Sequence, residues 1–191
     1  TFGRTVLVVV ERDEQLVASY GATALAERFV AVGASLSTAR VTAGKVVRHV
    51  FAKVGRPAWN VETFGALGIG AWAHETLLAM DPMPALAIEH EAPAEDGTIR
   101  LLLRARDGAL IESVLIPGPG RTTLCVSSQV GCARACSFCE TGTHGFSRQL
   151  SAGEIVDQVR LARELWAREK DKPPLSNVVF MGMGEPFDNL T

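Results

Sequence analysis

The spacing of hydrophobic residues divides the chain into a first part with helical patterns and a second part in which strands and helices alternate. An apolar run over residues 5–10 is typical of a buried strand, and the alanine-rich stretch 14–32 has helix-forming composition. Short helices interrupted by glycines are expected over 59–80. We therefore predict a mostly helical accessory region over residues 1–82, which a proline-rich break at 81–84 separates from the rest.

The clearest helical pattern lies over residues 43–54. Its apolar positions follow the i, i+3, i+4, i+7 spacing of one helix face: Val47, Val50, Phe51 and Val54. Basic side chains gather on the opposite face: Lys45, His49, Lys53 and Arg56. Charge on the outer side of a helix is often a solvated surface. Contact with RNA phosphate is the alternative role of this basic face.

Two Asp-Gly pairs, at 96–97 and 107–108, predict the tight turns of β-hairpins. Runs with strand composition flank these turns: 85–91, 98–105 and 109–116. The expected result is a small antiparallel β linker over residues 83–120, which closes with the stiff segment Pro117–Gly120.

The pattern over residues 121–191 predicts a strand, a helix and a second strand. The first strand covers 122–127, and an apolar strand over 177–181 has the composition of one buried on both faces in a parallel sheet. Between them, Ser151 and Glu154 have the capping-box spacing that opens a helix, which we expect to end near residue 170. The apolar stripe of this helix is expected at three positions: Ile155, Val159 and Ala162.

The predicted strand-helix-strand unit also indicates where a functional site would lie. In parallel α/β folds, functional residues gather at the carboxyl ends of the strands. The cysteine-rich loop that follows the first strand and the glycine-rich turn over 182–185 both lie at such ends. We therefore expect the two segments to form one site in an α/β protein.

Composition restricts the possible functions. The chain has 191 residues, 47% hydrophobic content and a net charge of −2, so a contact with nucleic acid must come from a local patch. No apolar run approaches the roughly 20 residues of a membrane helix, and no secretory signal pattern is present. We expect a cytoplasmic protein without membrane attachment. Because the chain begins without methionine and stops just after a glycine-rich turn, we also expect a fragment of a longer protein.

The most distinctive segment is 125–139, which holds all four cysteines and indicates metal or redox chemistry more than a disulfide framework. Three of them are spaced C-x3-C-x2-C: Cys132, Cys136 and Cys139. Three thiolates in one loop can hold a [4Fe-4S] cluster and leave one iron open to another ligand. A zinc site with His144 as fourth ligand is the competing interpretation, although zinc sites favour paired Cys-x2-Cys motifs.

With Phe138 before the last cysteine, the triplet resembles the C-x3-C-x-aromatic-C signature of radical S-adenosylmethionine (SAM) enzymes. Three neighbouring motifs are similar to those of the adenine-C2 methyltransferases of ribosomal and transfer RNA: Thr123-Leu-Cys-Val-Ser-Ser-Gln-Val-Gly-Cys132, Gly145-Phe-Ser-Arg148 and Met181-Gly-Met-Gly-Glu-Pro186. The resemblance is close over 111–189. It implies that residues 121–191 are the first units of a partial (βα) radical SAM barrel.

The resemblance also implies the cofactors, a [4Fe-4S] cluster and SAM. Cys132, Cys136 and Cys139 would ligate the cluster, while Gly184 and Glu185 would bind the methionine ammonium of SAM. Electron transfer from the cluster would cleave SAM to a 5′-deoxyadenosyl radical. Taken without the resemblance, the Gly-x-Gly pattern also fits a tight turn after a strand.

Cys125 precedes the triplet by seven residues. Its residue type and its position in a predicted strand indicate a small buried residue with a structural role. The resemblance instead implies a redox-active cysteine, which resolves a covalent enzyme–RNA intermediate by forming a transient disulfide with a methyl-carrying cysteine. That partner cysteine would lie in a C-terminal part that this chain does not contain.

Glu112 shares a strand face with three apolar residues, Leu110, Val114 and Ile116. Burial among them would raise the carboxyl pKa and prepare the group to accept a proton near neutral pH. The segment Ile111-Glu-Ser-Val-Leu-Ile-Pro117 is similar to the family segment that carries the proton acceptor. The resemblance therefore implies that Glu112 removes the adenine C2 proton, whereas an edge-strand glutamate in water is the alternative.

The activity implied by the resemblance is methylation of adenosine C2 in 23S rRNA and tRNA through a methyl-cysteine intermediate. The enzyme would be a monomer with a flavodoxin-type electron donor. Methylation at C8 is an alternative that Pro186 disfavours, and a zinc-stabilised RNA-binding module or a non-methylating radical SAM enzyme are alternatives of other classes. Arg134 and Arg148 either contact RNA phosphate or tie loops together. Glu140 departs from the small residue typical of the family.

Overall fold

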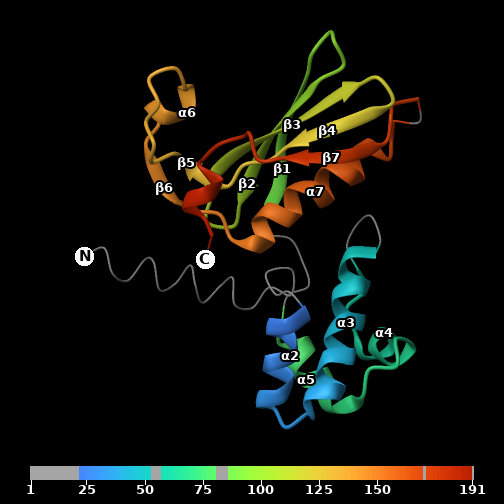
Figure 1. The fold of residues 1–191 in the computed structure, drawn as a ribbon. Coiled ribbons are helices and arrows are strands. Elements are labelled where there is room, and N and C mark those ends of the chain that lie inside the picture. The colour runs from blue at the N-terminus through green and yellow to red at the C-terminus, as the bar shows by residue number, and fades with distance from the viewer. Residues whose placement is uncertain (1–21, 53–56, 81–85, 170, 191) are drawn as a thin grey trace. The chain divides into compact units, whose positions relative to one another are not determined.

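The computed structural model describes residues 22–52, 57–80, 86–169 and 171–190, without the side chains of 51 and 52. The chain divides into two compact units, Thr1–Pro84 and Ala85–Thr191, whose elements are labelled in Figure 1. The strand predicted over 5–10 and the first part of the helix predicted over 14–32 lie outside the described residues.

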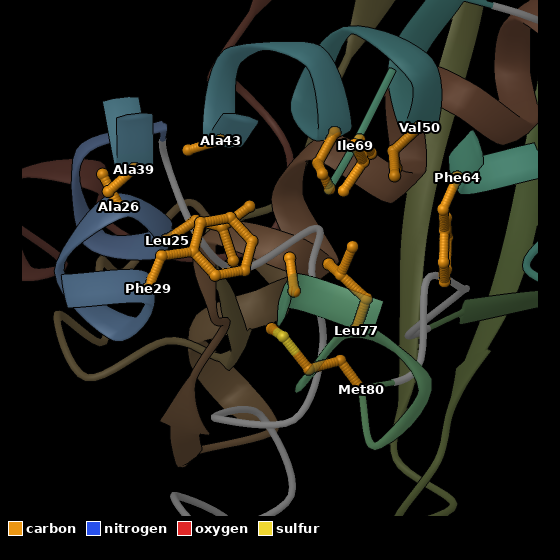
Figure 2. Close-up of a cluster of buried hydrophobic side chains, with 12 residues drawn as sticks. Leu25, Ala26, Phe29, Ala39, Ala43, Val50, Phe64, Ile69, Leu77 and Met80 are labelled. Atoms are coloured by element: carbon orange, nitrogen blue, oxygen red, sulfur yellow. The ribbon is translucent and has the colours of Figure 1, made fainter. Parts of the chain in front are cut away.

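The described part of the first unit consists of helices: α2 (Ala22–Ala31), α3 (Leu36–Ala52), α4 (Val61–Ala66), the 3-10 turn η2 (Ala71–Ala73) and α5 (His74–Leu78). Figure 2 shows the apolar core that they share. Phe29 stacks edge-on against Trp72 with ring centroids 5.3 Å apart. Trp59 meets Phe64 in the same way at 5.0 Å. Such pairs add to the stabilisation that burial of the rings provides.

The predicted apolar face of α3 was only partly right: Val50 is buried as expected, but the other buried positions of the helix differ from those predicted. The buried stripe consists of Ala39, Ala43, Val46 and Val50. Val47 only packs against the edge of the core, and Val54 lies outside the described residues. Two of the four positions are alanines, which a search for large apolar residues does not pick out.

Two residues of the predicted basic face have contacts within the chain. Lys45 Nζ donates a 2.8 Å hydrogen bond to the carbonyl of Gly68, and His49 Nε2 lies 3.1 Å from the carbonyl oxygen of Ala58. Lys53 and Arg56 lie outside the described residues. These contacts favour a structural role for Lys45 and His49.

The second unit is built on a mixed sheet in the order β1-β2-β3-β4-β7. Its strands are β1 (Leu86–Pro93), β2 (Ile99–Ala105), β3 (Leu110–Gly118), β4 (Arg121–Cys125) and β7 (Leu175–Val179). The first four strands are antiparallel, and β7 runs parallel to β4. Both predicted hairpins are confirmed, with φ of +84° at Gly97 and +88° at Gly108, a conformation that glycine adopts without strain.

Smaller elements complete this unit: β5 (Gln129–Gly131), which pairs with β6 (Phe146–Gln149), α6 (Glu140–Thr143), α7 (Ala152–Trp166) and the 3-10 turn η3 (Pro186–Asp188). The predicted capping box is confirmed, because Ser151 accepts from Glu154 N while the Glu154 carboxylate accepts from Ser151 N. The α/β class is confirmed, and the described strands form an open sheet. None of the described helices is long and apolar enough to cross a membrane.

Three expectations for this unit were wrong. Pro117–Gly120 is no separate linker, because Pro117 and Gly118 belong to β3 and a turn at Pro119 and Gly120 leads directly into β4 of the same sheet. The buried face of α7 includes Gln158 and Ala162, whereas Ile155 and Val159 are only partly buried. Strand β7 is largely exposed, with Val178 at 45%, because it is the edge strand of the described sheet.

Candidate functional site

The pairing of β3 with β4 places two of the predicted site residues on one face of the sheet. Val114 pairs with Cys125 and therefore shares a face with it. Glu112 lies two residues before Val114 on β3 and so projects from that same face. The opposite face carries Ser113, which contacts α7. Glu112 and Cys125 therefore lie on the sheet face that α7 does not cover.

The apolar burial expected for Glu112 was wrong. Its side chain is 44% exposed, and its Oε1 lies 3.9 Å from Arg100 Nε. The shared face with Leu110, Val114 and Ile116 is correct, but Leu110 and Ile116 are themselves exposed. The alternation of residues along β3 correctly predicted which of them share a face. It could not predict that no described helix covers this face, because that depends on the tertiary structure.

A cavity of about 520 Å³ adjoins the Glu112 carboxylate. Strands β2 and β3 contribute Arg100 and Glu112, helix α6 contributes Glu140, and His144 follows that helix directly. Met183 of the glycine-rich turn lines it as well. The cavity thus brings together the candidate base, the end of the cysteine loop and the glycine-rich turn, as the predicted single site requires.

Cys125 is buried at the end of β4. Burial raises the pKa of the Cys125 thiol above its ordinary value of 9.0, although a hydrogen bond with the backbone of Met181 acts in the opposite direction. Since the thiolate is the reactive form of cysteine, the raised pKa makes the Cys125 thiol less reactive in this conformation. The described environment matches that of a buried structural cysteine.

The three cysteines of the triplet lie on one loop between β5 and α6. Cys132 N donates to the carbonyl of Gly145 at 3.0 Å, and Cys139 N donates to the carbonyl of Cys136 at 3.0 Å. All three thiols are free, and Phe138 is 91% exposed. Free thiols in one short loop have the ligand chemistry of a [4Fe-4S] cluster. Within the described ranges, however, no three Cys, His, Asp or Glu side chains are arranged to hold a metal ion.

The glycine-rich turn packs tightly against the chain between β4 and β5. A Cβ atom on Gly182 would lie 2.8 Å from Ser127 Oγ and from the Val126 backbone, and one on Gly184 would lie 2.6 Å from Gln129 Cβ. Gly184 also has φ of +104°. These contacts explain both glycines as requirements of close packing. The Glu185 carboxylate accepts a 2.9 Å hydrogen bond from Phe187 N.

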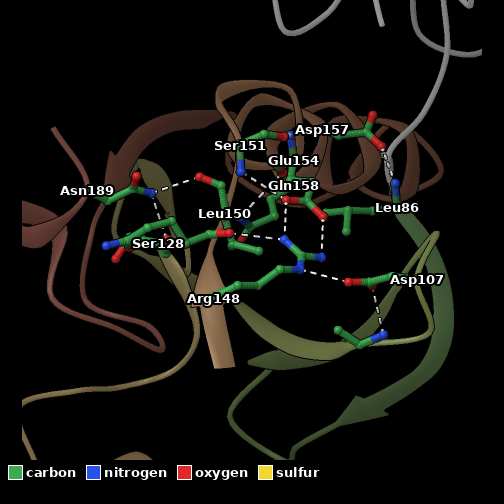
Figure 3. Close-up of polar contacts among 12 residues, drawn as sticks. Leu86, Asp107, Ser128, Arg148, Leu150, Ser151, Glu154, Asp157, Gln158 and Asn189 are labelled. Carbon is green, nitrogen blue, oxygen red and sulfur yellow. Dashed lines mark hydrogen bonds and ion pairs between the residues drawn. The ribbon is translucent and has the colours of Figure 1, made fainter. Parts of the chain in front are cut away.

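Arg148 ties loops together and is not free to contact RNA. Its guanidinium donates to both oxygens of Glu154 at 2.8 Å and to Asp107 Oδ2 at 2.7 Å, as Figure 3 shows. Burial lowers the pKa of Arg148, but the hydrogen bonds and charges of Glu154 and Asp107 outweigh it and raise the pKa overall. Arg134 forms an ion pair with Asp188, which joins the cysteine loop to η3.

Comparison with known proteins bears directly on this site. No protein-family model matches the chain. The chain is 64% identical over 184 residues to a probable RNA methyltransferase of Sorangium cellulosum (strain So ce56), covering 95% of this chain and 46% of the relative. It is 56% identical over 98 residues to the dual-specificity RNA methyltransferase RlmN of Oleidesulfovibrio alaskensis, covering 51% of this chain and 27% of the relative.

A solved structure agrees with these relatives. The crystal structure of a radical SAM methyltransferase from Sphaerobacter thermophilus is 38% identical, with a TM-score of 0.70, and the match covers 92% of this chain and 49% of that one. The chain belongs to the RlmN-like radical SAM RNA methyltransferases. It spans about half the length of that structure and less than half of the curated relatives named above.

Sequence reasoning missed the polar residues that connect the segments of the candidate site. Gln158 of α7 is fully buried, and its amide contacts Ser113 Oγ at 2.7 Å and both backbone polar groups of Ser127. Gln129 is also fully buried and accepts a 3.0 Å hydrogen bond from Glu185 N. A glutamine in a helix or strand pattern is typical of an exposed surface, so the pattern gave no signal for either residue.

Proposed function

We propose that this chain is the cluster-bearing part of a radical SAM methyltransferase that modifies C2 of adenosine in 23S rRNA and tRNA. The observation that carries the proposal is the loop of three free thiols, which follows β4 and ends beside the cavity that Glu112 lines. The dual specificity of RlmN relatives supports the choice of substrates.

Cys132, Cys136 and Cys139 would ligate the [4Fe-4S] cluster, since three thiolates leave one iron open to SAM. When bound, the cluster supplies the electron that cleaves SAM. Gly184 and Glu185 would contact the methionine part of SAM. The close approach of the glycine-rich turn to Ser127 and Gln129 supports this role, because it fixes the turn beside the segment that leads into the cysteine loop.

Glu112 would accept the proton that leaves adenine C2. Its accessibility supports the role, because a base must reach the proton that it abstracts and the carboxylate borders the cavity. Arg100 Nε lies 3.9 Å from the carboxylate and would help to hold it at the edge of the cavity.

Cys125 would act as the resolving thiol in a transient disulfide with a methyl-carrying cysteine outside this chain. Thiol exchange requires the thiolate and access to it. Because burial raises the pKa of Cys125, the end of β4 would have to open for exchange to occur. The carbon of the methyl-cysteine would already be bonded to the adenine at this stage, and formation of the disulfide would break its bond to the cysteine sulfur and release the methylated RNA.

The remaining parts of the proposal concern the whole protein. It would work in the cytoplasm as a monomer and receive its electron from a flavodoxin-type donor. Methylation at C8 is the alternative outcome of the same chemistry. The local RNA contact would come from the surface around the cavity, because the net charge of −2 gives no overall attraction to RNA.

The experiment that tests the proposal uses the full-length protein, reconstituted anaerobically with iron and sulfide and supplied with SAM and a reductant. Unmodified 23S rRNA and tRNA are the substrates, and their nucleosides are identified by mass spectrometry against synthetic standards. The expected product is 2-methyladenosine from both RNAs. Formation of 8-methyladenosine, or no methylation with a fully loaded cluster, would refute the C2 assignment.

A further inference from the structure

The hydroxyl of Ser127 connects three separate segments of the candidate site. Ser127 lies between Cys125 and the cysteine loop and is fully buried. Its Oγ donates a 2.6 Å hydrogen bond to the carbonyl of Glu112 and accepts a 2.9 Å hydrogen bond from Met183 N. One hydroxyl therefore joins the strand of the candidate base to the glycine-rich turn.

The buried amide of Gln158 holds Ser127 in place. Its Oε1 accepts from Ser127 N at 2.7 Å, and its Nε2 donates to the carbonyl of Ser127 at 2.9 Å. The same Oε1 accepts a 2.7 Å hydrogen bond from Ser113 Oγ, one residue after Glu112. Since β4 ends at Cys125, the Gln158 side chain satisfies backbone groups that lie beyond its last residue.

The space around the hydroxyl makes this link specific. A Cβ atom at Gly182 would lie 2.8 Å from Ser127 Oγ, so the turn and the hydroxyl fit only when position 182 is glycine. The next two residues after Ser127 also contact the turn: Ser128 N and Gln129 N donate to the carbonyl of Met183 at 2.8 and 3.2 Å. The turn is thus bonded to segment 127–129 through both polar groups of the Met183 backbone.

We infer that Ser127 is a positioning residue: its hydroxyl sets the glycine-rich turn relative to Glu112, and Gln158 fixes the hydroxyl. The inference rests on the proposed function only in assigning SAM to the turn. Because this buried hydroxyl both donates and accepts a hydrogen bond, it holds the Glu112 backbone and the Met183 backbone at a fixed separation. Removing it leaves the Met183 N–H and the Glu112 carbonyl without this partner.

The test compares Ser127→Ala with Thr122→Val, which removes another buried hydroxyl of the same chain segment. Thr122 Oγ1 donates to the carbonyl of Pro173 at 2.8 Å, at the other end of β4. Hydrogen exchange of the 181–185 amides is measured in the full chain without SAM. Ser127→Ala should accelerate this exchange about tenfold, the factor expected for one lost hydrogen bond, and Thr122→Val should leave it unchanged. Equal acceleration in both variants would overturn the inference.

A second measurement separates this inference from the proposed function. SAM binding is measured by equilibrium dialysis on the reconstituted protein, and Ser127→Ala should weaken it about tenfold relative to Thr122→Val. If the unmodified protein binds no SAM, the proposed function fails, while the exchange result still decides whether Ser127 positions the turn. Unchanged SAM affinity in Ser127→Ala would overturn its positioning role.

Discussion

Glu112 and Cys125 project from the same face of the sheet, because Cys125 pairs with Val114, two residues from Glu112 on β3. Their surroundings differ. The Glu112 carboxylate borders a cavity and is half-exposed, whereas the Cys125 thiol is buried and its pKa is raised by that burial. The Glu112 carboxylate is therefore accessible in the described conformation, whereas the Cys125 thiol is covered.

Replacing Glu112 by Gln should remove methyl transfer without affecting the fold. The loss of a general base typically costs about 10²–10⁴-fold in rate, whereas a change at an exposed position shifts the unfolding free energy by less than about 0.5 kcal/mol. Methylation is measured with the full-length protein. Glu89→Gln is the matched control, since Glu89 also sits on a strand in an exposed ion pair, with Arg104. A full rate in Glu112→Gln would exclude Glu112 as the base.

Replacing Arg148 by Met should destabilise the second unit by about 3–5 kcal/mol, the typical cost of removing one partner of a buried ion pair. Arg148 and Glu154 are only 18% and 5% exposed. Urea unfolding is followed by Trp166 fluorescence, with Trp59 and Trp72 replaced by Phe. Arg104→Met breaks an exposed pair, which solvent screens, and should therefore cost much less stability than Arg148→Met. An equal loss of unfolding free energy in the two variants would contradict the claim that burial makes the Arg148 ion pair more important for stability than the exposed Arg104 pair.

The ion pair of Asp107 predicts a pH dependence. Burial acts to raise the pKa of Asp107, but the hydrogen bond and charge of Arg148 and the hydrogen bonds from the backbone together outweigh it, so the pKa is lowered from the ordinary 3.8. The folded state therefore favours the carboxylate, and this stabilisation is present above pH 3.8 and is lost as the pH falls through the lowered folded value. The difference in unfolding free energy between the unmodified chain and Asp107→Asn should shrink over that acid range. A constant difference would show that the Asp107 charge does not contribute.

Replacing Gly184 by Ala should cost more stability than replacing Gly120 by Ala. Both glycines have positive φ, +104° and +72°, and a side chain in the left-handed region costs roughly 1–2 kcal/mol. At Gly120 nothing lies within 4 Å of the new Cβ, whereas at Gly184 it meets Gln129 at 2.6 Å. Urea unfolding compares the two variants. Equal costs would mean that Gln129 can move aside and does not fix the turn.

The elements of the second unit were largely predictable because their signals are local. The Asp-Gly turns and the Ser151 capping box each depend on residues a few positions apart, and both were confirmed. The exposure of Glu112 and the burial of Gln158 were not predictable, since they depend on which face α7 covers. Likewise, the ion-pair partners of Arg148 are Asp107, which is distant in sequence, and Glu154. The sequence alone therefore could not decide whether Arg148 ties loops together or contacts RNA.

The most direct test of the central claim is the iron and sulfide content of four single variants after anaerobic reconstitution. Cys132→Ala, Cys136→Ala and Cys139→Ala should each lose the cluster and its visible charge-transfer absorption, because each removes one of the three thiolate ligands. Cys125→Ala, which removes a buried thiol on β4, should retain the iron content of the unmodified chain. Equal iron loss in all four variants, or a colourless protein that binds one zinc ion, would contradict the assignment of the cluster to the triplet.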